Sequence, residues 1–126
     1  ELRKTMEPID VNSGIEGITW HSPRQSLFVI IEGPPGYLLE ISPDLKSILS
    51  ATELTAERGF VDPDKLKRKI DFSGVSHDAS RDALWILSDK ASRVYLYDLA
   101  SGSVVQSLTL DDGGNVREPA WSPYTR

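Results

Sequence analysis

Apolar residues in this chain gather in short runs that are separated by polar turns containing proline or glycine. The run at residues 27–32 is apolar on both faces and rich in β-branched and aromatic side chains, as is typical of a strand buried between two layers. The run at residues 94–99 alternates more regularly, as a strand with one buried face does. Pro23 presets the backbone for a type I turn, and Pro34 ends a run because proline cannot donate to a strand ladder. The pattern therefore predicts an all-β chain.

The runs form two copies of one pattern, with a period of about 57 residues. Residues 27–30 (Leu-Phe-Val-Ile) align without a gap with residues 84–87 (Leu-Trp-Ile-Leu). The expected strands are residues 17–21, 27–32, 37–42 and 48–54 in the first copy, and residues 74–77, 84–88, 94–99 and 104–110 in the second. A tandem repeat of this length indicates a repeat architecture.

Four short strands per repeat predict a β-propeller fragment, with two four-stranded antiparallel blades and the start of a third. The expected divisions are a lead-in strand or linker at 1–14, blade 1 at 15–54, a connector at 55–70, blade 2 at 71–110, and a further blade start or tail at 111–126. In the connector, Asp62 and Pro63 resemble a helix N-cap and first helical residue, although an irregular loop is an equal alternative. A β-sandwich is the main alternative fold, because eight short strands would also fill one.

Two blades leave apolar faces open, because each blade packs against its neighbours and a ring needs roughly four to eight blades. Residues 117–123 also echo residues 16–23, the opening of the first repeat. We therefore expect the partners of this chain to be the remaining blades of a longer parent protein. Self-association into a ring and a compact two-blade fold are the alternatives.

Composition narrows the classes of function. The formal charge of −5 argues against nucleic acid, because phosphate binding needs a basic face. The basic group at Lys65, Lys67, Arg68 and Lys69 is interpreted as a solvated connector.

The absence of cysteine excludes disulfides and thiolate chemistry. No stretch approaches the roughly 18 apolar residues of a membrane helix, and no signal peptide is visible, although the chain begins at Glu1 and leaves an upstream targeting segment open.

Short phrases in both repeats resemble the SdiA-regulated propeller family, a relative of NHL-type propellers and of the esterase-like phytases. The phrases are Gly14-Ile15-Glu16-Gly17-Ile18-Thr19, the strand at 27–32 with Pro34-Pro35, Asp71-Phe72-Ser73-Gly74-Val75, and Leu84-Trp85-Ile86-Leu87-Ser88-Asp89. The resemblance covers about residues 14–110. It implies a six-bladed ring, an exported or membrane-anchored bacterial protein outside the cytoplasm, and calcium in some relatives. The family has no generally accepted reaction, and this chain departs from it by having about two blades and by reading Glu118-Pro119-Ala120 at its third opening.

Carboxylates recur at matching places in the two repeats. Glu32 and Asp89 match, each ending a second strand. Glu16 and Ser73 hold equivalent positions just before a first strand, and Asp71 lies two residues ahead of Ser73. If they converge near the axis of a propeller, they could bind a hard cation such as calcium through oxygen. The alternative is that they accept backbone N–H bonds in turns and hold the blades together. Glu118 would join the set if a third blade begins there.

The histidines give little evidence for a zinc site, because His21 and His77 occupy different repeat positions. We expect a strand-end histidine that is hydrogen-bonded in a turn. The acidic run at residues 111–115 is interpreted as a turn rather than a calcium loop. The aromatic residues expected to pack between blades are Trp20, Phe28, Trp85, Tyr95 and Tyr97.

The function predicted from the sequence is a non-enzymatic ligand- or partner-binding module of an exported protein, with calcium as the candidate cofactor. Two alternatives stay open: a metal-dependent phosphoesterase of the phytase type and a protein-interaction scaffold. A phosphoesterase needs metal-binding carboxylates together with Lys or Arg that meet the phosphate. In this chain the basic residues cluster in the connector instead.

Overall fold

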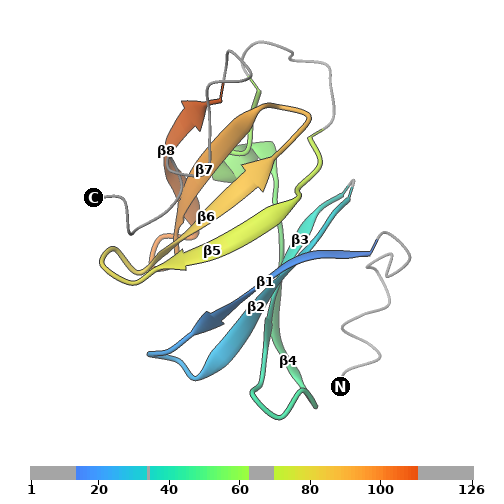
Figure 1. Cartoon of the computed structure of the whole chain (residues 1–126), viewed down its shortest axis with the longest axis vertical. Coiled ribbons are helices and arrows are strands. Elements are labelled where there is room, and N and C mark those ends of the chain that lie inside the picture. Colours follow the sequence, from blue (N-terminus) through green and yellow to red (C-terminus); the bar gives the residue numbers. More distant parts are fainter. Residues whose placement is uncertain (1–13, 34, 63–69, 111–126) are drawn as a thin grey trace.

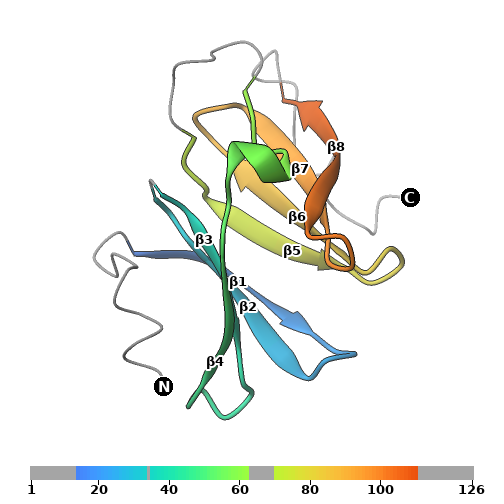
Figure 2. The same cartoon turned by 180° about the vertical axis from the view of Figure 1, so that it is seen from behind.

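The computed structural model describes residues 14–33, 35–62 and 70–110, which form two four-stranded antiparallel sheets (Figures 1 and 2). Blade 1 contains β1 (Ile15–His21), β2 (Ser26–Ile31), β3 (Tyr37–Ile41) and β4 (Ile48–Glu53). Blade 2 contains β5 (Gly74–Asp78), β6 (Ala83–Ser88), β7 (Arg93–Asp98) and β8 (Ser103–Thr109). Each strand pairs with the next one along the chain. The predicted fold class is therefore confirmed: the chain is all-β, with two blades of a propeller.

Several predicted features fall outside the described residues. They are the lead-in before Gly14, the helix or loop beginning at Pro63, the basic group of the connector, the acidic turn at 111–115, and the opening of a further blade.

The two blades meet through their first strands and fan apart from there (Figures 1 and 2), whereas the two sheets of a β-sandwich would stack face to face. Strand β5 contacts β1 and β2 of the other blade. A Cβ atom at Gly17 would lie 3.0 Å from the backbone nitrogen of Val75 and 3.1 Å from the Cα of Gly74. Glycine at position 17 therefore permits the two backbones to come this close.

One apolar core fills the space between the facing sides of the blades. Its buried members are Phe28, Ile30 and Leu38 from blade 1, Leu84, Ile86, Tyr95 and Tyr97 from blade 2, and Leu54, Phe60 and Phe72 from the segments between them. Phe60 has edge-to-face contacts with Phe72 and Tyr95, with ring centroids 5.4 and 5.2 Å away, and stacks on Tyr97 at 5.7 Å. These arrangements are the ones that aromatic pairs prefer.

A short 3₁₀ helix, η2 (Ala56–Arg58), positions Phe60. The Oγ1 of Thr55 accepts the N–H of Arg58 at 3.3 Å, and Gly59 ends the helix in the left-handed conformation at φ 109°. The guanidinium of Arg58 donates to the carbonyl of Gly102 at 2.9 Å, which ties the helix to the turn between β7 and β8. This helix was not predicted from the sequence.

The aromatic residues separate according to the alternation of side chains along each strand. Phe28, Tyr95 and Tyr97 lie in the core between the blades, as expected. Trp20 pairs with Leu27 rather than with Phe28, so it points to the outer face of blade 1, where it is 43% exposed. Trp85 pairs with Ser76 and Leu96, and it lies on the outer face of blade 2 for the same reason.

We predict that Phe60→Ala lowers the free energy of unfolding by about 3–5 kcal/mol, because it leaves a cavity among three aromatic rings. Val105→Ala is the control: Val105 is 59% exposed, so we expect a change within about 0.5 kcal/mol. Urea unfolding followed by circular dichroism measures both variants. Equal stability of the two would contradict the assignment of Phe60 to the shared core.

Candidate functional site

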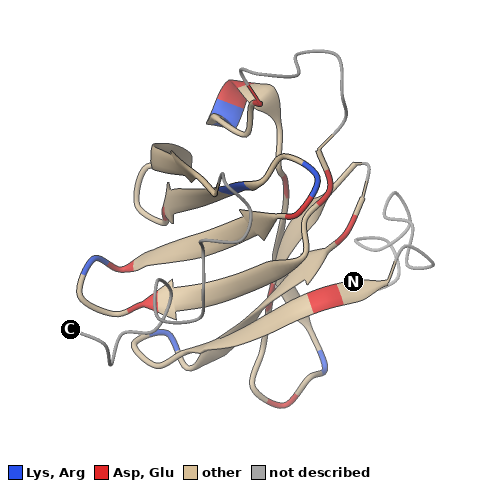
Figure 3. Cartoon of the chain, turned by 45° about the horizontal axis from the view of Figure 1, so that its top comes forward, with Lys and Arg blue, Asp and Glu red and all other residues tan. Residues whose placement is uncertain are grey.

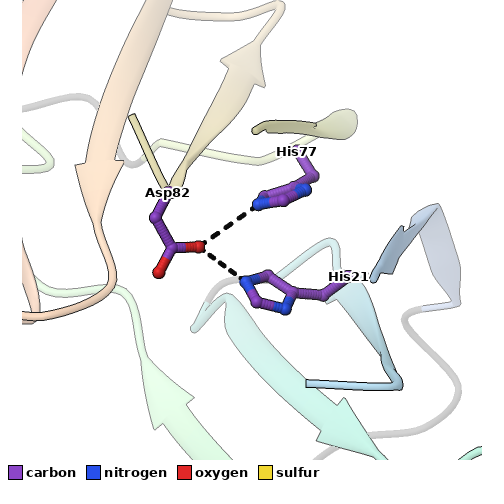
Figure 4. A group of neighbouring side chains, drawn as sticks. All are labelled: His21, His77 and Asp82. Carbon is purple, nitrogen blue, oxygen red and sulfur yellow. Dashed lines mark hydrogen bonds and ion pairs between the residues drawn. The ribbon is translucent and has the colours of Figure 1, made fainter. Parts of the chain in front are cut away.

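Two histidines and one aspartate meet between the blades, and we call His21, His77 and Asp82 the His–Asp site (Figure 4). His21 is the last residue of β1, His77 lies near the end of β5, and Asp82 ends the turn before β6. The Oδ1 of Asp82 lies 2.6 Å from the Nε2 of His21 and 3.3 Å from the Nε2 of His77. The imidazole rings are tilted by 45°, with centroids 4.2 Å apart.

The backbone places these side chains through a turn that both blades share. In each blade the first strand enters a turn whose last residue has a left-handed conformation, Gln25 at φ 52° and Asp82 at φ 51°. Aspartate and asparagine adopt this conformation more readily than most residues. The side chain of Asp82 consequently points back across the blade boundary to His21, which is 61 residues earlier in the chain.

His21 takes the place in blade 1 that Asp78 has in blade 2. The Oδ1 of Asp78 accepts the backbone N–H groups of Ser80 and Arg81 at 3.1 and 3.3 Å, which is an Asx turn. The Nδ1 of His21 accepts the backbone N–H of Arg24 at 3.1 Å. The expectation of a strand-end histidine that is hydrogen-bonded in a turn is therefore confirmed.

This hydrogen bond assigns the protonation of the His21 ring. A neutral imidazole whose Nδ1 accepts a hydrogen bond carries its proton on Nε2. The Nε2–H of His21 therefore donates to Asp82. A second inter-blade bond runs alongside, because the backbone N–H of His77 donates to the Oγ1 of Thr19 at 3.1 Å.

The site is buried on one side and open on the other. The side chains of His21 and His77 are 1% and 8% exposed, while that of Asp82 is 56% exposed. The hydrogen bond from His21 lowers the pKa of Asp82 below its usual value; desolvation opposes this effect, and the bond from His77 adds to it. Asp82 is consequently an ionised carboxylate that faces two imidazoles and remains accessible to water.

Next to the His–Asp site, blade 1 contains an ion pair between the exposed Arg24 and the buried Glu40. Arg24 donates to the Oε1 of Glu40 at 3.0 Å, and Ser26 donates to the Oε2 at 2.7 Å. The guanidinium of Arg24 also lies 5.8 Å from the ring centroid of Phe28, whose ring meets His21 edge-on at 5.6 Å. Glu40 is 9% exposed, and these two hydrogen bonds compensate for the burial of its carboxylate.

The four carboxylates expected to bind a cation lie at the other end of the same strands. Glu16 is near the start of β1, Glu32 follows β2, Asp71 precedes β5 and Asp89 follows β6. The antiparallel register brings these strand ends together, since Ile15 pairs with Ile31 and Gly74 pairs with Leu87. Figure 3 shows that the charged residues of the described part of the chain lie mostly in turns and near strand ends.

Hydrogen bonds link parts of this acidic end. The carbonyl of Glu32 accepts the backbone N–H of Phe72 at 3.2 Å, and the Oδ1 of Asp71 accepts that of Lys90 at 3.4 Å. The bond to the Asp71 carboxylate is of the kind expected from a structural role, whereas Glu32 accepts through its backbone carbonyl. Within the described residues, the group whose ligand atoms all lie within 4.8 Å of one another is the His–Asp site. The calcium site at Glu16, Glu32, Asp71 and Asp89 stays a prediction.

Sequence reasoning identified both histidines but did not bring them together, and it did not include Asp82. The two histidines are offset by one position in the repeat, so the alignment placed them on opposite faces of their strands. They meet because opposite faces of neighbouring blades face each other: His21 lies on the Phe28 face of blade 1, two residues after Thr19, and His77 pairs with Leu84 on the facing side of blade 2. The sequence feature that could have predicted this meeting is that both histidines lie at the ends of the first strands of neighbouring blades.

The chain has the architecture of a β-propeller: each antiparallel sheet contains four consecutive strands, and the two sheets meet through their first strands. The model of the family described as SdiA-regulated matches residues 4–118. The chain belongs to the SdiA-regulated family.

A solved structure of a luciferin-regenerating enzyme is similar to this chain, with a TM-score of 0.53 and 13% sequence identity. The similarity covers 76% of this chain and 30% of that enzyme, so the chain spans about a third of the enzyme's length. At this identity the similarity bears on the fold alone. No curated protein matches the chain.

We predict that the stabilising effect of Asp78 disappears in acid. Burial raises the pKa of Asp78, but hydrogen bonds from Ser80, Arg81 and Trp85 outweigh burial and lower the pKa to about 2. A lowered pKa means that the ionised group stabilises the fold above its unfolded value of 3.8, and that this contribution is lost as the pH falls to about 2.

Asp78→Asn should therefore be less stable than the natural chain at pH 7, with a gap that closes between pH 4 and pH 2. Urea unfolding at a series of pH values measures the gap. A gap that stays constant across this range would contradict the assignment.

Proposed function

We propose that this chain is part of a β-propeller that acts as a non-enzymatic binding module. The observation that carries the proposal is the outer face of blade 1. Along β1, Ile18 is 57% exposed and Trp20 is 43% exposed. Ile18 pairs across the strands with Val29, which belongs to a buried apolar cluster with Ile31 and Leu39. Exposed apolar side chains that extend such a cluster are typical of an interaction site.

The position of this surface indicates its occupant. It is the broad side of a blade, which in a propeller packs against the next blade. The proposed partner is therefore another blade, supplied by a longer parent chain or by a second copy. The similarity to only 30% of the neighbouring solved chain supports the same proposal.

The two blades form a frame that suits binding. Among the described residues, hydrogen bonds between the blades run from the Nε2 of His21 to Asp82 at 2.6 Å, from the N–H of His77 to Thr19 at 3.1 Å, and from the N–H of Phe72 to Glu32 at 3.2 Å. These bonds lie at both ends of the first strands, so the relative orientation of the blades is fixed. Turns held on such a frame can present a ligand or partner surface.

The proposal includes an exported location, which follows from the family resemblance. In the part of the chain that the structure describes, no helix has the length and hydrophobicity needed to cross a membrane.

We predict that the chain alone self-associates through the outer face of blade 1 and that Ile18→Lys reduces this association, because it places a charge on the apolar surface. Light scattering over a range of concentrations measures the apparent mass. Gln106→Lys, at an exposed position of β8, is the charge-matched control. A chain that stays monomeric at every concentration, or an Ile18→Lys variant that behaves like the control, would count against this interaction surface.

For the acidic end, we predict that calcium raises the melting temperature and that the double variant Glu32→Ala, Asp89→Ala removes this effect, because oxygen ligands are lost. Differential scanning calorimetry with and without calcium tests it. An unchanged melting temperature would reject the calcium site. Metal-dependent hydrolysis of p-nitrophenyl phosphate would instead support the phosphoesterase alternative.

A further inference from the structure

We propose that the His–Asp site binds a divalent transition-metal ion such as Zn²⁺, which then links the two blades. The site offers two imidazole nitrogens and one carboxylate oxygen, and these three atoms all lie within 4.8 Å of one another. Nitrogen and oxygen ligands of these types are the ones that Zn²⁺ takes in proteins. This proposal is independent of the calcium prediction, since it concerns different residues at the other end of the strands.

The spacing of the ligand atoms is close to that of a coordinated ion. Two ligands of a tetrahedral zinc ion, each about 2.0 Å from the metal, lie about 3.3 Å apart. The Nε2 of His77 and the Oδ1 of Asp82 are already 3.3 Å apart. The Nε2 of His21 and the same oxygen are 2.6 Å apart, so the carboxylate must move away by about 0.7 Å to admit the ion.

The environment permits that movement. Asp82 lies in a turn with its side chain 56% exposed, whereas His21 and His77 are held in place by burial. The ion would therefore enter from the side of Asp82 and meet two fixed nitrogens. The same open side leaves room for a water molecule as the fourth ligand, as is common where a zinc ion has three protein ligands.

Metal binding competes with a hydrogen bond that the free site makes. To bind a metal through Nε2, neutral His21 must carry its proton on Nδ1. The backbone N–H of Arg24, which donates to that nitrogen at 3.1 Å, then loses its acceptor. The two N–H groups would then face each other, so the backbone at Arg24 must move away from the fixed His21 ring; Arg24 lies in an exposed turn, where its N–H can bind water after that movement. The competition favours ions that bind imidazole strongly.

The chemistry of the ligands also discriminates against calcium. Calcium takes six to eight oxygen ligands, whereas imidazole suits zinc, copper, nickel and iron. A calcium ion would find one carboxylate here and two nitrogens. Zinc and calcium should therefore bind at opposite ends of the first strands, if both bind.

The test uses the whole chain, purified without a polyhistidine tag and dialysed against EDTA and then metal-free buffer. We expect isothermal titration calorimetry with Zn²⁺ to give one saturable site per chain. Saturating Zn²⁺ should raise the melting temperature by several degrees, because the ion binds the folded state. Calcium should not displace it. Co²⁺ bound in place of Zn²⁺ should show the visible absorption of a four-coordinate site.

Two variants and one control locate the ion. His77→Ala and Asp82→Asn should each weaken Zn²⁺ binding by about tenfold or more. Asn tolerates the left-handed backbone of position 82, so Asp82→Asn should fold even if His77→Ala does not. Asp89→Asn removes an exposed carboxylate from the opposite end, and it should leave the affinity unchanged.

The outcomes are decisive in both directions. Loss of binding in the site variants with retention in Asp89→Asn supports the proposal. Absence of saturable Zn²⁺ binding by the natural chain would overturn it. Binding that survives Asp82→Asn and is lost in Asp89→Asn would place the ion at the acidic end and would also overturn it.

Discussion

The close approach of strands β1 and β5 is the contact on which the rest of the structure depends. Gly17 favours it because it has no side chain: a Cβ atom there would lie 3.0–3.1 Å from the backbone of Val75 and Gly74, which is closer than ordinary contact. From this contact the sheets diverge, and the space between them is filled by one aromatic core. The same contact brings the ends of the two strands together, which places an imidazole of blade 1 beside a carboxylate of blade 2. Core and site therefore follow from one steric condition.

The His–Asp site shows how a repeated turn acquires a new property. Both blades need a side-chain acceptor at the end of the first strand to satisfy a backbone N–H in the turn. Blade 2 uses Asp78 and blade 1 uses His21. The carboxylate of Asp78 accepts hydrogen bonds within its own turn and has no proton to donate. A neutral imidazole that accepts through one nitrogen carries its proton on the other nitrogen and can donate from there. The choice of histidine in blade 1 thus directs a donor out of the turn and toward the neighbouring blade.

Most of the fold could be predicted from the sequence, because it is encoded locally. The ungapped match of residues 27–30 with residues 84–87 defines the two blades, and Pro23 and the glycines mark their turns. The 3₁₀ helix η2 was missed because its cap, Thr55, resembles any polar connector residue. Trp20 was expected to pack between blades, and its register with Leu27 places it on the face of blade 1 that points away from blade 2.

The site was harder to predict than the fold. It joins residues 61 positions apart, and the repeat alignment pairs His77 with Trp20 rather than with His21. Only the close approach of the first strands, which depends on the absence of a side chain at one glycine, brings the three residues together. Recognition of the acidic positions was easier because they recur, but recurrence alone does not bring their oxygens within reach of one ion.

The substitution of histidine by aspartate between the two copies makes the blades distinguishable at their boundary. Blade 1 offers the imidazole of His21 to the blade that follows it, and blade 2 offers the carboxylate of Asp82 to the blade that precedes it. The two blades therefore differ in the groups that they place at their shared boundary. Blade 2 has no histidine at the corresponding strand end, and it cannot offer the same donor to whatever follows it. The hydrogen bond between His21 and Asp82 therefore distinguishes the order of two otherwise similar blades. A protein with swapped or duplicated blades would lose this bond at the blade boundary.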